Sequence, residues 1–426
     1  MTERELNRTL GVPMLVFYGT GMILGAGIYS IIGKAAAHTG ETLWISFLLA
    51  AFVAFLTACS YAELSSMFPK AGAEYVYLNH AFPTQKWIGS TVGASMAFAG
   101  IATATTVGVA FSGYFAQFLD WPRIPVAVGM LMILGIVALV GVRISGWTNV
   151  VFTLIEMAGL ILIVVLGLRS DQFGEAFTAI PHSGTLSGAA LVVFSYFGFE
   201  NIVNLAEEAR KPEKALPRAI FLSLLISSVL YFGVSLGALA LLSVDALAGS
   251  EAALMTAAQS VSEKWGRVLG AIALFSTANT ALISMVGSSR VIYGMSKGGA
   301  VPMSWGHVSK SSRTPWVATL IVFTLAILML PLGDVEVLAG ISSFATMVAF
   351  FMVNLAVIRL RRMLPDQARG FRSPLSFRSL PLLALLGMLM SAVFLTQLKI
   401  VSINMGLMVL LIASGFFLIR QRFSSV

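Results

Sequence analysis

The chain has 426 residues, of which 58% are hydrophobic and only 11% carry a charged side chain. A soluble protein has about 25% charged residues, and the apolar residues here fall in runs of about 20, the length that crosses a bilayer. This composition excludes an ordinary soluble domain and predicts an all-α polytopic membrane protein. The net charge of +8 does not indicate binding to nucleic acid, because the basic residues lie between the apolar runs.

Motifs for enzymatic chemistry are missing from the sequence. The single cysteine, Cys59, excludes an intrachain disulfide, and the four histidines do not have the spacing of metal ligands. There is no Walker-type loop, no His-Glu-x-x-His and no Gly-x-Ser-x-Gly. We therefore expect neither an enzyme nor a bound cofactor or metal, and the chain alone is not expected to use ATP.

The apolar runs predict about twelve membrane-spanning helices. Their order places 21 of the 27 basic residues on the side that holds both termini and six on the other side. Because Lys and Arg are enriched in cytoplasmic loops, both termini are expected in the cytoplasm, with the chain in the cytoplasmic membrane. The expected spans are 13–33, 42–66, 87–115, 123–142, 148–168, 186–207, 217–243, 267–295, 315–333, 336–360, 379–397 and 400–419.

These spans suggest two units of five helices followed by a pair. We expect the first unit at 11–168, the second at 186–362 and a peripheral pair at 379–420. Since five is odd, the two units must enter the membrane from opposite faces, which makes them inverted repeats.

The first span carries four glycines within nine residues, from Gly19 to Gly27. Glycine accepts backbone conformations that other residues avoid, so this helix can open there. The N–H groups of Ala26, Gly27 and Ile28 would then bind a carboxylate at the positive end of the following half-helix. The alternative is close helix packing, which small residues spaced by four also favour.

The sixth span has a matching interruption around Gly198, which lies between two phenylalanines. Opening this helix would free the carbonyls of Phe194 to Phe197 to accept hydrogen bonds from an ammonium group. The side chains of Phe194, Tyr196 and Phe197 would form apolar walls. Breaks at corresponding places of two halves indicate a transporter's substrate site. N–H groups for a carboxylate at the first break and carbonyls for an ammonium group at the second together describe a site for a zwitterionic α-amino acid.

Two glutamates lie inside predicted spans, where a carboxylate is unfavourable and usually functional. Glu200 directly follows the second break and could carry a proton or gate the site; alternatively it only bonds the loosened backbone. Glu156 in the fifth span could couple transport to an ion, or it could pair with a polar group on a neighbouring helix. Asn279 in the eighth span could approach the substrate or bond across helices.

Four motifs in order resemble those of the amino acid–polyamine–organocation transporters, specifically the bacterial amino acid permeases. The stretch Gly21-Met-Ile-Leu-Gly-Ala-Gly-Ile-Tyr29 is similar to the first-helix signature of that family. Residues 62–77, 197–219 and 289–302 are similar to the signatures after helices two, six and eight. The resemblance covers residues 11 to about 360.

The resemblance implies the leucine-transporter-type fold, with a 5+5 inverted repeat, discontinuous helices one and six, and alternating access. It implies that Gly25, Ala26 and Gly27 hold the substrate carboxylate, and that the carbonyls of Ile23, Phe194 and Phe197 hold the amino group. Together with the residue patterns, it predicts these substrate-binding residues: Ile23, Leu24, Gly25, Ala26, Gly27, Ile28, Phe194, Ser195, Tyr196, Phe197, Gly198 and Asn279.

One position departs from the family pattern. Many proton-coupled members carry a lysine in helix five where this chain has Glu156. A carboxylate cannot imitate that cation, but it can bind a proton, or a sodium ion together with helix-one carbonyls and Asn279 or Thr280. We therefore expect Glu156 and Glu200 to be the coupling residues and leave the coupling ion, H⁺ or Na⁺, open.

Three functions remain on the sequence alone. The first is a secondary transporter, symporter or exchanger, of neutral α-amino acids. The second is an exchanger of cationic amino acids or polyamines, for which Glu200 is the evident acid in the pocket. The third is a membrane scaffold without transport, which would not need two breaks within spans. The partners expected are an amino acid substrate and the lipid bilayer, with monomer and homodimer both open.

Overall fold

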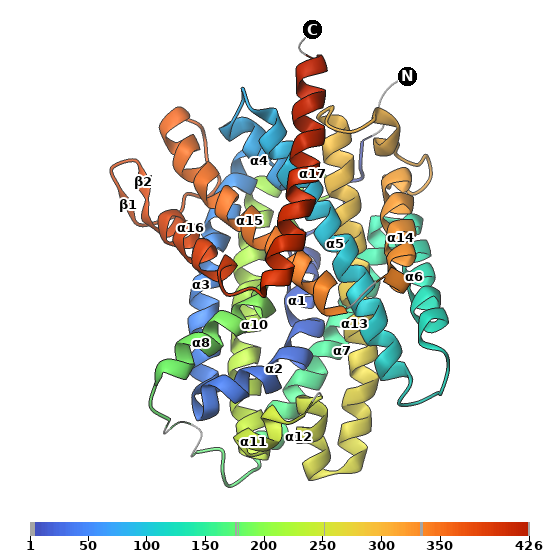
Figure 1. Ribbon diagram of the computed structural model, residues 1–426, viewed down its shortest axis with the longest axis vertical. Helices are drawn as coiled ribbons and strands as arrows, with labels where there is room; N and C mark the ends of the chain where they lie inside the picture. Colours follow the sequence, from blue (N-terminus) through green and yellow to red (C-terminus); the bar gives the residue numbers. More distant parts are fainter. Residues whose placement is uncertain (1–4, 175–176, 178, 251, 333–334, 425–426) are drawn as a thin grey trace.

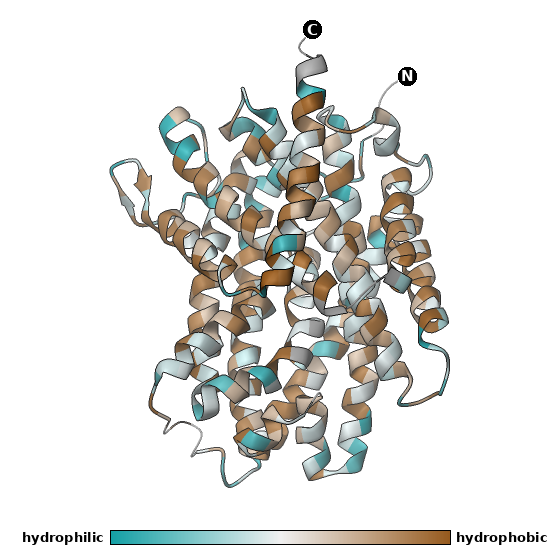
Figure 2. Ribbon diagram, viewed as in Figure 1, coloured by the Kyte–Doolittle hydropathy of each residue, from teal (hydrophilic) through white to brown (hydrophobic). Residues whose placement is uncertain are grey.

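The computed structural model describes residues 5–174, 177, 179–250, 252–332 and 335–424. The described chain is almost entirely helical, and most of its long helices lie roughly along one common axis (Figure 1). Apolar residues predominate along the helices, and polar residues gather toward the two ends of the molecule (Figure 2). The expected all-α polytopic membrane protein is confirmed.

Ten helices in the described ranges are long and apolar enough to cross a membrane. Eight of them are continuous: α3 (Leu43–Met67), α5 (Lys86–Phe115), α6 (Arg123–Val140), α7 (Val142–Leu168), α10 (Pro212–Leu241), α13 (Glu263–Lys297), α15 (Val335–Met363) and α17 (Ile400–Ser424). The other two are interrupted, α1 (Val12–Leu24) with α2 (Ala26–Thr39), and α8 (Ser183–Val192) with η3 (Val193–Tyr196) and α9 (Phe199–Val203). The ninth and eleventh expected spans are the shorter apolar helices α14 (Trp316–Met329) and α16 (Leu382–Leu395).

Several short elements were not expected from the apolar runs, because they are too short or too polar to show a clear period. They include an antiparallel hairpin, in the connector before α16, whose two strands have two residues each. The elements are η1 (Gly40–Thr42), α4 (Ala73–Ala81), α11 (Val244–Ala248), α12 (Ala253–Val261), η4 (Met303–Gly306), η5 (Leu330–Leu332), β1 (Ser376–Phe377) and β2 (Leu380–Pro381).

The breaks of the two interrupted helices lie in the interior of the bundle, where Leu24, Gly25 and Gly198 are buried. The segment α1–α2 packs against α10, α7, α8, α9 and α13, while α8 and its continuation also pack against α3. A glycine allows one of these contacts, because a Cβ on Gly21 would lie only 2.2 Å from the Thr153 hydroxyl of α7 and 2.6 Å from the Asn279 amide of α13. Small residues therefore let α1 approach polar side chains of two neighbouring helices.

The N-terminal segment and the C-terminal end of α17 lie at the same end of the molecule, and α11 and α12 lie at the opposite end (Figure 1). At the terminal end, Leu10 forms backbone hydrogen bonds with Glu208 and Arg210 in the segment that follows α9. These bonds fix the start of α1 against that segment.

Buried ion pairs hold the same end together. One basic residue departs from the expectation that they all lie between the apolar runs: the side chain of Arg290 is fully buried in α13 and binds both carboxylate oxygens of Glu208, at 2.8 and 3.1 Å. Glu63 of α3 similarly binds Arg361 and Arg369, which anchors the connector after α15. Arginine can lie inside the fold because a bidentate carboxylate satisfies its donors.

Candidate functional site

The first break occurs at Gly25, between α1 and α2. Gly25 has φ −43° and ψ −151°, so the helix opens there without a positive φ. A Cβ on this residue would lie 2.0 Å from the Thr280 hydroxyl oxygen of α13. The close approach of α13, rather than a left-handed conformation, requires glycine at this position. The chain resumes as α2 at Ala26, so the positive end of the α2 dipole lies at the break.

The second break occurs at Phe197 and Gly198. The helix narrows to the 3₁₀ turn η3, Phe197 is extended, and Gly198 adopts φ +135° before α9 begins. Glycine is required here for two reasons, since this φ disfavours side chains and a Cβ would lie 2.6 Å from the Met22 side chain. The chain is thus interrupted at both places that the sequence predicts.

The two breaks face each other. A Cβ on Gly27 would lie 3.5 Å from the Ser195 Cα, and one on Gly198 would lie 3.0 Å from the backbone nitrogen of Ile23. The fully buried Tyr231 of α10 joins them, because its hydroxyl donates to the carbonyl oxygen of Ile23 and to that of Ser195 at 3.1 Å. A phenol has one hydrogen, so the two carbonyls share it. Tyr231 was not predicted, and as a lone tyrosine in an apolar helix it gives no sequence signal.

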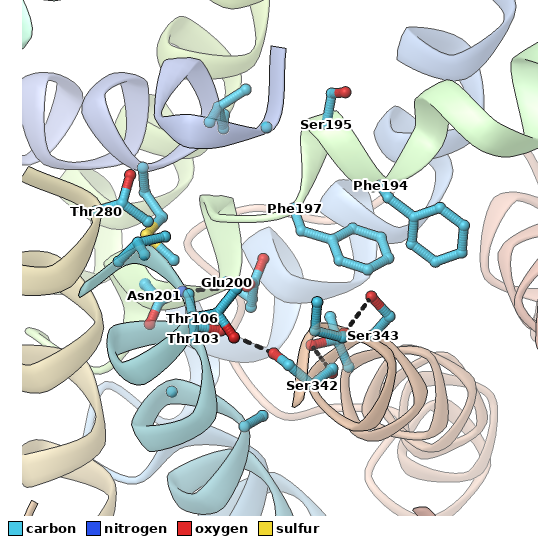
Figure 3. Close-up of a pocket in the computed structure, with 18 of the residues that line it drawn as sticks. Thr103, Thr106, Phe194, Ser195, Phe197, Glu200, Asn201, Thr280, Ser342 and Ser343 are labelled. Carbon is cyan, nitrogen blue, oxygen red and sulfur yellow. Dashed lines mark hydrogen bonds between the residues drawn. The ribbon is translucent and has the colours of Figure 1, made fainter. Parts of the chain in front are cut away.

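A cavity of about 240 Å³ lies beside the two breaks. Figure 3 shows Phe194 and Phe197 together on one side, with ring centroids 5.1 Å apart. The predicted residues that line it are Ile23, Gly27, Phe194, Ser195, Phe197, Glu200 and Thr280.

The wall opposite the phenylalanines carries hydroxyl groups from α5 and α15 (Figure 3). The hydroxyls of Thr103 and Ser342 are 2.8 Å apart, and that of Thr106 is buried with no hydrogen bond in the described structure. We did not predict this wall. Hydroxyl residues three or four apart inside apolar spans, such as Ser342 and Thr346, are the signal that could have found it.

Several predicted site residues lie outside the cavity lining, namely Leu24, Gly25, Ile28, Tyr196, Gly198 and Asn279. The hydroxyl of Tyr196 donates to the Phe47 carbonyl at 3.1 Å, so the residue packs into α3. The amide of Asn279 bonds Thr153 and Asn149 of α7 across the helix interface. The side chain of Ala26 lies outside the described part of the chain. The binding roles of all these residues stay predictions.

Glu200 lines the cavity and also stabilises the second break. One carboxylate oxygen accepts the backbone N–H of Gly198 at 2.7 Å. The other accepts the side-chain amide of Asn201 at 3.1 Å (Figure 3). The side chain is only 3% exposed. The carboxylate thus bonds the loosened backbone while it faces the cavity. The role of Glu200 as a proton carrier or gate stays a prediction.

Glu156 of α7 is fully buried, and it is absent from the cavity lining. Neither of its carboxylate oxygens forms a hydrogen bond with the described residues. Its polar neighbours are Asn279 and Ser276 of α13, and Thr280 lies one turn further along α13, in contact with Gly25. An acid with unsatisfied oxygens beside a helix break is a place where a proton or a cation can be held.

Glu74 lies on α4, outside the long apolar helices, and is completely buried. Tyr61 donates to one of its oxygens at 3.0 Å, and the other oxygen has no partner in the described structure. Burial raises the pKa of Glu74 to about 7 from the usual 4.5, although hydrogen bonds from its own backbone and from Tyr61 oppose the shift.

This shift predicts a pH-dependent stability. The protonated side chain is favoured in the fold, so its stabilising contribution is complete below about pH 4.5 and is lost as the pH rises through 7. We expect the melting temperature of the wild type to fall more between pH 5 and pH 8 than that of Glu74→Gln. Thermal unfolding at the two pH values measures this, with exposed Glu213→Gln as the control. Equal slopes in wild type and Glu74→Gln would contradict the prediction.

A family model described as amino acid permease matches residues 10–419. The chain belongs to the amino acid permease family. This membership confirms the predicted relation to the amino acid–polyamine–organocation superfamily and indicates a transporter rather than an enzyme. The broken helices and the cavity between them thus lie in a permease.

Similar proteins include transporters of different substrates. The permease is 29% identical to the branched-chain amino acid permease BcaP of Bacillus subtilis, covering 87% of this chain and 85% of that protein. It is 27% identical to the methylthioribose transporter of the same organism, with the same coverage. It is 29% identical to the vacuolar cationic amino acid transporter 2 of Arabidopsis thaliana, and there it covers 85% of this chain but only 61% of the longer plant protein.

Proposed function

We propose that the permease is a secondary active transporter that moves neutral α-amino acids across the cytoplasmic membrane by alternating access. The observation that carries this proposal is the meeting of both interrupted helices at one cavity. The positive end of α2 would hold the substrate carboxylate. The carbonyls of Ile23, Phe194 and Phe197 would hold its amino group, since a carbonyl oxygen can accept a second hydrogen bond.

The proposal includes a leucine-transporter-type fold in which twelve segments cross the membrane. The first repeat would comprise residues 11–168, the second 186–362, and the peripheral pair 379–420. The packing of α1–α2, α3, α8–α9 and α10 against one another supports a bundle that moves against the other helices. The excess of basic residues on one side supports a cytoplasmic location of both termini.

A neutral substrate is favoured by the way Glu200 is engaged. Both of its oxygens already accept hydrogen bonds at the break, which leaves less capacity for a substrate cation. The two phenylalanines and the wall of hydroxyls provide apolar and neutral polar surfaces instead. The second candidate is a cationic amino acid or polyamine exchanger, supported by the position of Glu200 in the lining and by the name of the plant relative.

Uptake into proteoliposomes tests the proposal. Purified protein should accumulate or exchange radiolabelled alanine or leucine, and an excess of unlabelled neutral amino acids should compete. Arginine and putrescine should compete weakly. Strong competition by arginine or putrescine would favour the second candidate. Transport of neither an amino acid nor putrescine would refute both.

Glu156 is proposed as the residue that couples transport to H⁺ or Na⁺. Replacing it with glutamine keeps the shape but removes the charge, so transport should lose its dependence on pH or sodium. Initial uptake rates over a pH series, with and without sodium, measure this. Glu263→Gln, at the exposed start of α13, is the control. Unchanged ion dependence in Glu156→Gln would exclude Glu156 from coupling.

A further inference from the structure

A second cavity, of about 410 Å³, lies at the terminal end of the molecule where the N-terminal segment meets α7. Met14 and Phe17 of α1 and Trp147 of α7 form its apolar part. A Cβ on Gly146 would lie 3.0 Å from the Met14 sulfur, so the two helices approach closely beside it. Among the described residues the two cavities share no lining residue, so this cavity is separate from the proposed substrate site.

The polar part of this cavity is positively charged. Arg143 from the first turn of α7 and Arg210 from the segment after α9 both line it, and both are exposed. No acidic residue is among its described lining residues, and neither guanidinium group forms a hydrogen bond or an ion pair within the described structure. Two arginines in one hollow, with no carboxylate, match a ligand that carries phosphate oxygens.

The cavity continues onto an apolar stripe of α7. Ile144, Trp147, Val151 and Leu154 are each between 49% and 58% exposed and lie on one face of the helix. A face of this kind on a spanning helix contacts lipid tails, and tryptophan is enriched at the membrane interface. Arg143 precedes the stripe at the start of α7, so in a bilayer the basic part of the cavity would lie at the level of the lipid headgroups.

We propose that this cavity binds an anionic phospholipid, with the headgroup phosphate between Arg143 and Arg210 and an acyl chain along the α7 stripe. A free phosphate ion would satisfy the two arginines but would leave Met14, Phe17 and Trp147 exposed to water. A phospholipid satisfies both parts of the site, and basic hollows between spanning helices suit such headgroups.

The lipid would join three segments of the chain: the N-terminal segment before α1, the segment after α9, and α7. The first two are already bonded to each other, through the backbone of Leu10 with Glu208 and Arg210, and Arg143 belongs to the third. A phosphate held by both arginines would therefore fix the start of α1 against α7. Bound lipid is expected to stabilise the arrangement seen here, because a ligand that binds the folded form raises its stability.

The test uses the full chain, purified with thorough removal of native lipid. Phosphatidylglycerol, phosphatidylcholine and inorganic phosphate are added separately, and melting temperature and the number of retained lipids by native mass spectrometry are measured. The variant R143Q/R210Q is compared with R362Q/R372Q, which loses the same charge at exposed arginines outside the cavity.

Phosphatidylglycerol should raise the melting temperature of the wild type and of R362Q/R372Q, and R143Q/R210Q should lose both this rise and the retained lipid. Native mass spectrometry shows whether the lipid is retained even if a variant is less stable. Equal effects of phosphatidylcholine, full lipid retention by R143Q/R210Q, or an equal rise with inorganic phosphate alone would each overturn the proposal. Because substrate uptake is not measured, failure here would leave the proposed transport function intact.

Discussion

Replacing Tyr231 with phenylalanine is expected to weaken substrate binding about ten-fold and to slow transport, while the protein stays folded. The Tyr231 hydroxyl bonds the carbonyls of Ile23 and Ser195, so it ties the end of α1 to the break before α9. Leaving a buried acceptor without its donor is unfavourable by about 1–3 kcal/mol. A loss of about 1.4 kcal/mol in binding free energy corresponds to a ten-fold weaker binding constant. Equilibrium binding of a radiolabelled substrate and initial uptake rates measure the effect.

Tyr196 provides a matched control for this experiment. Its ring lies 5.2 Å from that of Tyr231, and it is equally buried, but its hydroxyl bonds Phe47 of α3. Tyr196→Phe keeps the aromatic ring that was expected to form an apolar wall and removes only the hydroxyl that bonds Phe47. It should therefore lower stability to a similar extent and leave substrate affinity near that of the wild type. Equal loss of affinity in the two variants, or none in Tyr231→Phe, would show that the bridge between the breaks does not shape the site.

Replacing Glu208 with glutamine is expected to destabilise the protein by about 3–5 kcal/mol, because it leaves the Arg290 charge buried without its partner. Both side chains are completely buried, and the pair is bidentate. The backbone carbonyl of Glu208 also accepts the N–H of Leu10, so the N-terminal segment should loosen as well. A large fall in melting temperature, and faster proteolysis before residue 12, are the expected readings.

Two comparisons make this result specific. Glu207→Gln changes the neighbouring acid, which is partly exposed and bonds Tyr293 and the backbone of Ala71, and it should lower the melting temperature much less. Combining Glu208→Gln with Arg290→Gln removes the unpaired charge and should recover part of the loss. A Glu208→Gln protein as stable as wild type would mean that the pair contributes little to the fold.

Much of the fold could be predicted because membrane-spanning helices are encoded locally. A run of about 20 apolar residues specifies a spanning helix whatever its neighbours are, since lipid requires the backbone to bond within the segment. The breaks at Gly25 and Gly198 were also found from local sequence, as glycine stood within apolar runs. The reason why residue 25 must be glycine is not local, because the missing side chain makes room for Thr280 of α13.

The parts that could not be predicted depend on contacts between distant segments. The buried pair of Arg290 with Glu208 joins residues 82 positions apart, and nothing in the sequence near either residue indicates it. Tyr231 bridges two carbonyls 36 and 208 positions away. A backbone carbonyl has no sequence signature, so a bond to it cannot be found by inspecting residue types.

The sequence by itself determined that the chain is a helical membrane protein of the permease family and which two helices are interrupted, because length, hydropathy and glycine act within a single segment. The tertiary structure decided which faces of those helices meet and which side chains line the cavity. It also decided that the Glu156 carboxylate has no hydrogen bond to any described residue, while Glu200 holds the second break. These features depend on packing between segments, which hydropathy does not record.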